Sequence, residues 1–500
     1  MDPGSGEIDQ TVSSVEERFE RWRRRVGLPA GPAAGLLVWL LPLAGLTPDG
    51  HRLAAIVSGA VVWWITEAVP IPVTALFASA LTVVFGLSPA QAALAPYASP
   101  TIFLFMGSFI LGEAITVHGL DRRISGALLS VAWVGRSDVR VRMAVGALAV
   151  TLSAWMSNTA TAAMLLPMAI GLAGGRAATG QRSPATGLML VLAYAASIGG
   201  VATPVGSPPN LITIGMLEQL AGVEIDFFRW MALGVPIALI GYVTLVLLTG
   251  WLYPGARTAA TRGAAAALRV GTPWTRGEVN CIIAFATAVV LWLIPGIAAI
   301  GWGASSAEAK WLGSRFDEGV VAIIAASLLF MLPVNWKRRE FTVSWRQAVR
   351  IDWGTILLFG GGLSLGRLMF ETGLAEAVGR GVLDLSGASS LWSVTAVMLI
   401  VAVLTTEMAS NTAAANMLVP VAIAVAKTAG VSPVPPALAV GLGASMAFML
   451  PISTPPNAIV YGTGRVPITS MISCGVLLDA VMCLVVLAVL YVLCPVLGLV

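Results

Sequence analysis

Apolar runs of roughly 20 residues, separated by short segments rich in polar residues, Gly and Pro, recur from Leu36 almost to Val500. A helix of about 20 residues crosses a hydrocarbon layer of about 30 Å, so each run predicts one membrane-spanning helix. The expected fold class is an all-α polytopic membrane protein with eleven transmembrane helices. The predicted spans are 31–48, 51–68, 70–87, 101–118, 186–219, 230–252, 278–301, 319–333, 353–373, 434–462 and 471–497.

Two further apolar stretches, 141–174 and 390–426, each have a polar Ser-Asn-Thr tripeptide near the middle. Two complete crossings need about 40 residues, which is more than either stretch contains. Two half-crossings that meet at a polar tip fit this length and pattern better. Each stretch is therefore expected to be a re-entrant helical hairpin with its tip inside the membrane.

The chain contains an internal duplication, because three blocks of sequence recur in the same order at offsets of 254, 253 and 247 residues. Each copy would contain five complete spans and one hairpin, so the second copy would enter the membrane upside down. Inverted repeats of this kind are typical of secondary transporters, whose site lies near the midplane between the copies. The matching blocks are 103–120 with 357–374, 154–170 with 407–423, and 203–212 with 450–459.

This duplication divides the chain into segments. The predicted segments are a cytoplasmic N-terminal segment (1–30), a first transmembrane helix (31–50), a first repeat (51–253), a cytoplasmic linker (254–277) and a second repeat (278–500). With the N-terminus inside, 22 of the 29 basic residues fall in cytoplasmic segments, as the positive-inside rule requires. We expect a multi-pass protein of the inner cell membrane with a cytoplasmic N-terminus and an extracytoplasmic C-terminus.

Composition excludes a soluble protein, whose surface needs more charge than this chain has. Hydrophobic residues make up 57% of the 500 residues, charged residues 11%, and the mean hydropathy is +0.87. The pI of about 9.0 comes from basic residues dispersed among loops, so no nucleic-acid partner is expected. The two histidines near span ends offer little for catalysis, and no enzyme activity or cofactor is expected.

The two tripeptides, Ser157 to Thr159 and Ser410 to Thr412, consist of good helix N-caps. A tip of this kind starts the returning half-helix, whose free N–H groups attract an anion. Double prolines follow at Ser207-Pro208-Pro209-Asn210 and Thr454-Pro455-Pro456-Asn457, where the missing N–H groups leave carbonyls free to bind a cation. Each half therefore offers groups for both kinds of ion. Caps and kinks without a binding role remain the alternative.

No Lys, Arg or His occurs in 153–170, 196–216, 405–423 or 446–464. An anion there would be held by hydroxyls, amides and helix ends alone, so bound cations would have to supply the missing charge. Hard oxygen ligands without thiolate or imidazole suit sodium better than a transition metal. An uncharged substrate would also satisfy this composition.

The paired tips, the two Pro-Pro-Asn breaks and the segment WWITEAVPIPVTAL (63–76) resemble the divalent anion/sodium symporter family over roughly residues 50–495. Members of this family carry dicarboxylates, citrate or sulfate. The resemblance implies a homodimer in the lipid bilayer, whose transport domain moves as an elevator against a fixed scaffold. It also implies two sodium sites flanking the anion, and in its dicarboxylate branch uptake of C4-dicarboxylates such as succinate, malate and fumarate.

Family ligands carry over to matching positions. The first sodium site would use Ser153, Ser157, Asn158 and the backbone near Gly206. The second would use Thr406, Ser410, Asn411 and the backbone near Ser453. The anion ligands would be Asn158, Thr159, Ser207, Asn411, Thr412, Thr454 and Pro455. Ala409 stands where the family often has Thr, which affects pocket width.

Several alternatives remain open at this point. A sodium-independent dicarboxylate exchanger with the same fold differs only in coupling, and a sulfate or citrate carrier only in substrate. A channel would not need two sealed tips at one site. Glu67, Glu113 and Glu407 are candidates for proton relay because they lie in or near spans, although a hydrogen-bonding role is favoured.

Overall fold

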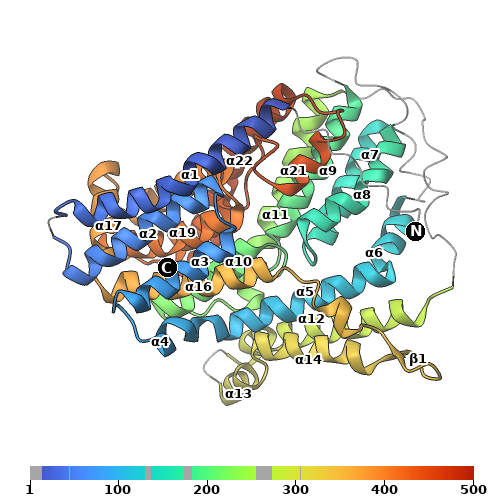
Figure 1. The fold of residues 1–500 in the computed structure, drawn as a ribbon. Helices are drawn as coiled ribbons and strands as arrows, with labels where there is room; N and C mark the ends of the chain where they lie inside the picture. The colour runs from blue at the N-terminus through green and yellow to red at the C-terminus, as the bar shows by residue number, and fades with distance from the viewer. Residues whose placement is uncertain (1–13, 44, 130–136, 174–182, 255–272, 304–305) are drawn as a thin grey trace.

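The computed structural model describes residues 14–43, 45–129, 137–173, 183–254, 273–303 and 306–500. Most of the predicted linker 254–277 lies outside these residues. The described chain is helical except for one antiparallel pair of strands, β1 (Pro333–Asn335) and β2 (Glu340–Phe341), as Figure 1 shows. The all-α expectation is therefore confirmed.

The elements fall into two series that correspond to the two sequence copies. The first series comprises α1 (Ser14–Leu40), α2 (Pro48–Thr66), α3 (Ile71–Val84), α4 (Ala90–Leu94), η1 (Ala95–Ala98), α5 (Pro100–His118), α6 (Leu120–Leu129), α7 (Asp138–Ser153), α8 (Asn158–Ala173), α9 (Pro184–Gly200), α10 (Pro208–Met216), η3 (Leu217–Ala221) and α11 (Phe227–Leu252). The second comprises α12 (Arg276–Trp302), α13 (Ala307–Arg315), α14 (Glu318–Met331), α15 (Trp345–Ala348), α16 (Trp353–Glu371), α17 (Leu374–Ser386), α18 (Leu391–Met408), α19 (Asn411–Thr428), α20 (Val434–Gly443), α21 (Pro455–Tyr461) and α22 (Ile468–Val496).

Among the described residues, six helices are long and apolar enough to cross a membrane, and the chain is a multi-pass membrane protein. They are α5, α11, α12, α16, α18 and α22. The expected long spans 186–219 and 434–462 are each broken into two helices, α9 with α10 and α20 with α21. Helix α9 ends at Gly200 and α20 at Gly443, and the double prolines begin α10 and α21, where a missing N–H group costs no helical hydrogen bond.

The first helix differs from its expected span, since α1 begins at Ser14 and ends at Leu40. Its length is explained by close packing against α2. A side chain at Gly27 would lie 2.2 Å from Thr66 Oγ1, and one at Gly31 would lie 2.3 Å from Trp63 Nε1. These glycines let the two backbones approach, and the contact supports the helix across its internal prolines.

Matched glycines join the two halves. A side chain at Gly107 of α5 would lie 2.7 Å from Ala322 Cβ of α14, and one at Gly361 of α16 would lie 2.7 Å from Ala75 Cβ of α3. Gly107 and Gly361 are the same position of the duplicated sequence. Small residues allow close helix contact in membranes. At each of these glycines, a helix of one half therefore packs closely against a helix of the other half.

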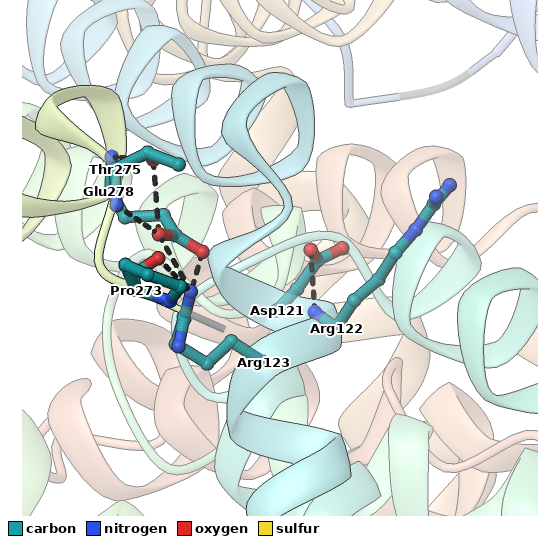
Figure 2. Close-up of polar contacts among 6 residues, drawn as sticks. All are labelled: Asp121, Arg122, Arg123, Pro273, Thr275 and Glu278. Atoms are coloured by element: carbon teal, nitrogen blue, oxygen red, sulfur yellow. Dashed lines mark hydrogen bonds and ion pairs between the residues drawn. The ribbon is translucent and has the colours of Figure 1, made fainter. Parts of the chain in front are cut away.

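The beginning of α6 is tied to the beginning of α12 by a buried ion pair (Figure 2). Arg123 Nε donates to Glu278 Oε1 at 2.8 Å, and Arg123 Nη2 donates to Glu278 Oε2 at 3.1 Å. The Thr275 N–H also donates to this carboxylate, at 2.8 Å, and the Glu278 side chain is fully buried. The bidentate geometry fixes where these two helices meet.

Candidate functional site

The first polar tip is a short loop between α7, which ends at Ser153, and α8, which begins at Asn158. The side chains of these two residues meet at 2.6 Å. One orientation of the Asn158 amide donates to Ser153 Oγ, to Ala196 O at 3.2 Å and to Gly206 O at 3.3 Å. In the other orientation the amide oxygen faces the same three oxygens. The tip therefore gathers oxygen atoms from α7, α9 and the loop before α10 around one amide.

The second tip has the corresponding geometry between α18 and α19. The Thr406 hydroxyl lies 2.8 Å from Asn411 Oδ1 and 2.7 Å from Ala444 O. A single hydroxyl proton serves only one of these acceptors, so the three oxygens again outnumber their donors. Thr406 is buried, as Ser153 is at the first tip. In both halves, the hydroxyl five residues before the tip asparagine thus contacts the amide of that asparagine.

Two asparagines that the sequence analysis did not assign hold the broken helices open. Asn210 Nδ2 donates to Gly200 O and to Thr203 O, each at 2.8 Å. Asn457 Nδ2 makes the matching bonds to Ala447 O and Leu450 O, each at 3.0 Å. Their position in both Pro-Pro-Asn motifs was the available signal. They replace the missing helical hydrogen bonds across the break.

The expected anion ligands lie at the same junction of helices. Ser207 is the N-cap residue directly before α10, and its hydroxyl lies 3.3 Å from Ser445 Oγ. The loop before α10 therefore contacts the loop between α20 and α21. The Thr454 hydroxyl accepts from the Asn457 N–H at 3.4 Å at the start of α21. Of the remaining expected ligands, Thr159, Ser410, Asn411 and Thr412 are half-buried, Ser157 and Pro455 are exposed, and Ser453 and Gly206 are buried.

Packing interleaves the two halves at this place. Helix α8 packs against α21, and α19 packs against α10. Each helix that begins at a tip therefore packs against the second helix of the break in the other half. Helix N-termini and hydroxyls favour an anion, whereas the oxygen clusters behind the tips favour a hard cation. Among the described residues no cluster of three or more His, Cys, Asp or Glu suggests a transition metal.

Two of the three intramembrane glutamates have defined partners. Glu67 pairs with Arg23 at 3.2 Å, next to α1, which supports a structural role. Glu407 accepts from the N–H of Met449 at 2.7 Å and of Leu450 at 3.2 Å, and from Ser453 Oγ at 2.5 Å. It therefore anchors the second break to α18.

Comparison with known proteins fits this arrangement. A family model described as the sodium:sulfate symporter transmembrane region matches residues 24–500. The chain belongs to this family. The expected resemblance to the divalent anion/sodium symporters, dicarboxylate branch, is thereby confirmed. The match includes both tips and both broken helices.

Individual relatives cover nearly the whole chain. The sodium-dependent dicarboxylate transporter SdcS of Staphylococcus saprophyticus is 32% identical, over 99% of this chain and 97% of its own. SdcS of Staphylococcus aureus USA300 is 30% identical, over 98% and 97%. An uncharacterized transporter of Haemophilus influenzae is 33% identical, over 91% and 93%. The crystal structure of the Alcanivorax borkumensis YdaH transporter shares the fold, with a TM-score of 0.53 at 16% identity over 94% of this chain and 96% of that one.

Proposed function

We propose that this family member is a secondary active transporter that takes C4-dicarboxylates of the succinate, malate and fumarate class into the cell by symport with sodium. The observation that carries the proposal is the oxygen cluster around Asn158, repeated at Asn411, in a region without a basic side chain. The dicarboxylate relatives named above support the choice of substrate.

Sodium would bind behind each tip. The first ion would contact Ser153, Ser157, Asn158 and the backbone at Gly206, and its counterpart would contact Thr406, Ser410, Asn411 and the backbone at Ser453. The gathering of Ser153 Oγ, Ala196 O and Gly206 O around the Asn158 amide supports the first site. Oxygen-only ligands of this kind suit a hard cation.

The dicarboxylate would lie between the tips. Its carboxylates would accept hydrogen bonds from the Asn158 and Asn411 amides and from the Thr159 and Thr412 hydroxyls, with further contacts from Ser207, Thr454 and Pro455. The half-buried tip residues and the packing of α8 against α21 and of α19 against α10 support this position. Two sodium ions beside it would balance the two negative charges, since no Lys or Arg does so.

Alternating access would follow from the duplication. Among the described residues, α19 packs against α17, but its counterpart α8 makes no comparable contact with α6. If α19 left α17 while α8 packed against α6, the protein would pass from one state to the opposite state. This exchange favours an elevator movement of the tips and broken helices against the remaining helices. The proposal also includes eleven spans, two inverted repeats with re-entrant hairpins, and a homodimer in the inner membrane.

The test is uptake of radiolabelled succinate into proteoliposomes with and without an inward sodium gradient. Symport predicts accumulation above equilibrium that stops when choline replaces sodium. Uptake that is unaffected by this replacement but requires a preloaded counter-anion would establish an exchanger instead. Competition by sulfate or citrate stronger than that by malate and fumarate would overturn the assigned substrate class.

A further inference from the structure

Two buried carboxyl groups meet behind the second tip. Glu407 of α18 is 4% exposed and Asp479 of α22 is 3% exposed. The Asp479 carboxyl group faces that of Glu407 and the N–H side of Phe448. Glu407 takes three donors from the loop between α20 and α21, as described above, so its negative charge is well supported.

Asp479 has less support, because only the Phe448 N–H faces it, without the geometry of an ordinary hydrogen bond. Both of its carboxylate oxygens are buried without a hydrogen-bond partner. The titratable groups near Asp479 offer no compensating charge, because they are an acid, a phenol and thiols. They are Glu407 on α18, Tyr194 on α9, and Cys474 and Cys483 on α22 itself. The Tyr194 hydroxyl donates elsewhere, to Met471 O at 3.1 Å.

The fold does not require this carboxyl pair. Gly234 of α11 and Gly475 of α22 are 241 residues apart and occupy matching places, since a side chain at either would collide with the backbone oxygen of a matching residue, Val201 or Phe448. At the same offset the counterpart of Asp479 is Ala238.

The partner acid is also absent from the first half. The counterpart of Glu407, at the hairpin offset of 253, is Ala154. The first half therefore builds the same architecture with two alanines where the second half has two acids. A pair that appears together in only one of two equivalent places is better explained by binding than by architecture.

We propose that Glu407 and Asp479 bind a third coupling sodium ion, at a site present only in the second half. The inference rests on the proposed sodium symport. A buried carboxylate with little donor support next to a second carboxylate is costly unless a cation or a proton compensates for its charge. Asp479 offers two free oxygens, and Glu407 Oε1 has a single N–H partner, so both groups retain lone pairs for a cation.

A monovalent ion fits this place better than a divalent one. Calcium takes six to eight oxygen ligands, and magnesium keeps several waters. The two carboxyl groups offer at most four oxygens, and Glu407 Oε2 already has two donors, so this place supplies fewer ligands than calcium takes.

The position also links this ion to the second tip. Glu407 holds Ser453 through the Ser453 hydroxyl, and the backbone at Ser453 belongs to the proposed second sodium site. A cation between Glu407 and Asp479 would fix α22 to this loop and order it for the second ion. Three sodium ions with one dianion would carry one net positive charge inward in each cycle.

The test compares sodium stoichiometry in three purified full-length proteins: the wild type, Asp479→Asn, and the control Glu376→Gln, which removes an exposed carboxyl from α17. Equilibrium binding of radiolabelled sodium gives the number of ions bound, and the reversal potential in proteoliposomes gives the number transported with succinate. We expect three sodium ions for the wild type and the control, and two for Asp479→Asn.

The variant Asp479→Ala provides a second measurement if the amide variant fails to fold, because it gives α22 the alanine that stands at the matching position of the first half. Its expected count is also two. Equal counts in the wild type and either variant would overturn the third site. So would a count of two in the wild type with a proton gradient supplying the additional charge. A wild type that binds no sodium would instead refute the proposed symport.

Discussion

The Thr406 hydroxyl lies 2.8 Å from Asn411 Oδ1, and Ser153 makes the same contact with Asn158 at 2.6 Å. The same hydroxyl–amide pair thus occurs in both copies of the duplicated sequence. The chemistry of this pair leads to the first two predictions.

Loss of either hydroxyl should weaken sodium binding. Ser153→Ala and Thr406→Ala each remove one oxygen ligand, and the loss of about 1 kcal/mol predicts a several-fold higher sodium concentration for half-maximal uptake. The apparent affinity for succinate at saturating sodium should change little. The measurement is a two-dimensional titration of uptake against sodium and succinate. Thr405→Ala is the control, because its hydroxyl bonds only to Val401 O of its own helix; an equal shift in that variant would contradict the assignment.

The tip amides should serve both ligands. Asn158→Ala and Asn411→Ala should weaken sodium and succinate together, since one amide can present its oxygen to a cation and its N–H group to a carboxylate. Thr159→Ala and Thr412→Ala should reduce mainly succinate affinity, by several-fold. The same titration separates the two patterns. Wild-type constants for both ligands in correctly folded Asn variants would show that the tips are only helix caps.

The asparagines of the two breaks should contribute to stability. Asn210→Ala or Asn457→Ala removes two hydrogen bonds to buried carbonyls, which predicts a loss of about 2 kcal/mol and a lower midpoint of thermal unfolding in detergent. Asn335→Ala is the control, because Asn335 caps an exposed turn. A midpoint equal to that of the wild type in both break variants would refute this role.

The ion pair between α6 and α12 should be sensitive to removal of one partner. Arg123→Ala leaves the fully buried Glu278 carboxylate unpaired, and breaking such a pair costs about 3–5 kcal/mol. The exposed pair Arg380–Glu376 is the control, and Arg380→Ala should cost at most about 1 kcal/mol. Thermal unfolding of the purified variants measures both. Equal losses in the free energy of unfolding would mean that burial does not determine how much these ion pairs contribute to stability.

The topology prediction is that the termini lie on opposite sides of the membrane, with the N-terminus in the cytoplasm. It follows from the 22 of 29 basic residues in predicted cytoplasmic segments. Single cysteines introduced near each terminus, in a background without the four native cysteines, should react with a membrane-impermeant reagent from opposite sides. Labelling of both from one side would reject the odd number of spans.

Much of the architecture could be predicted from sequence because it is encoded locally or by repetition. Apolar length predicts helices, and the double prolines predict the starts of α10 and α21. The constant offset between the copies predicts that Ser153 and Thr406 play the same role. The position of each tip could be predicted because Ser, Asn and Thr favour helix starts, and helices begin at Asn158 and Asn411.

The tertiary structure alone decided which distant segments meet. No periodicity indicates that α8 faces α21, that Asn158 reaches Ala196 O, or that Asp479 lies beside Glu407. These contacts depend on how closely the helix backbones approach, which is set by glycines such as Gly475 acting against a particular neighbour. A sequence specifies where small and polar residues stand along each helix, but only the packed helices determine which of them share one buried space.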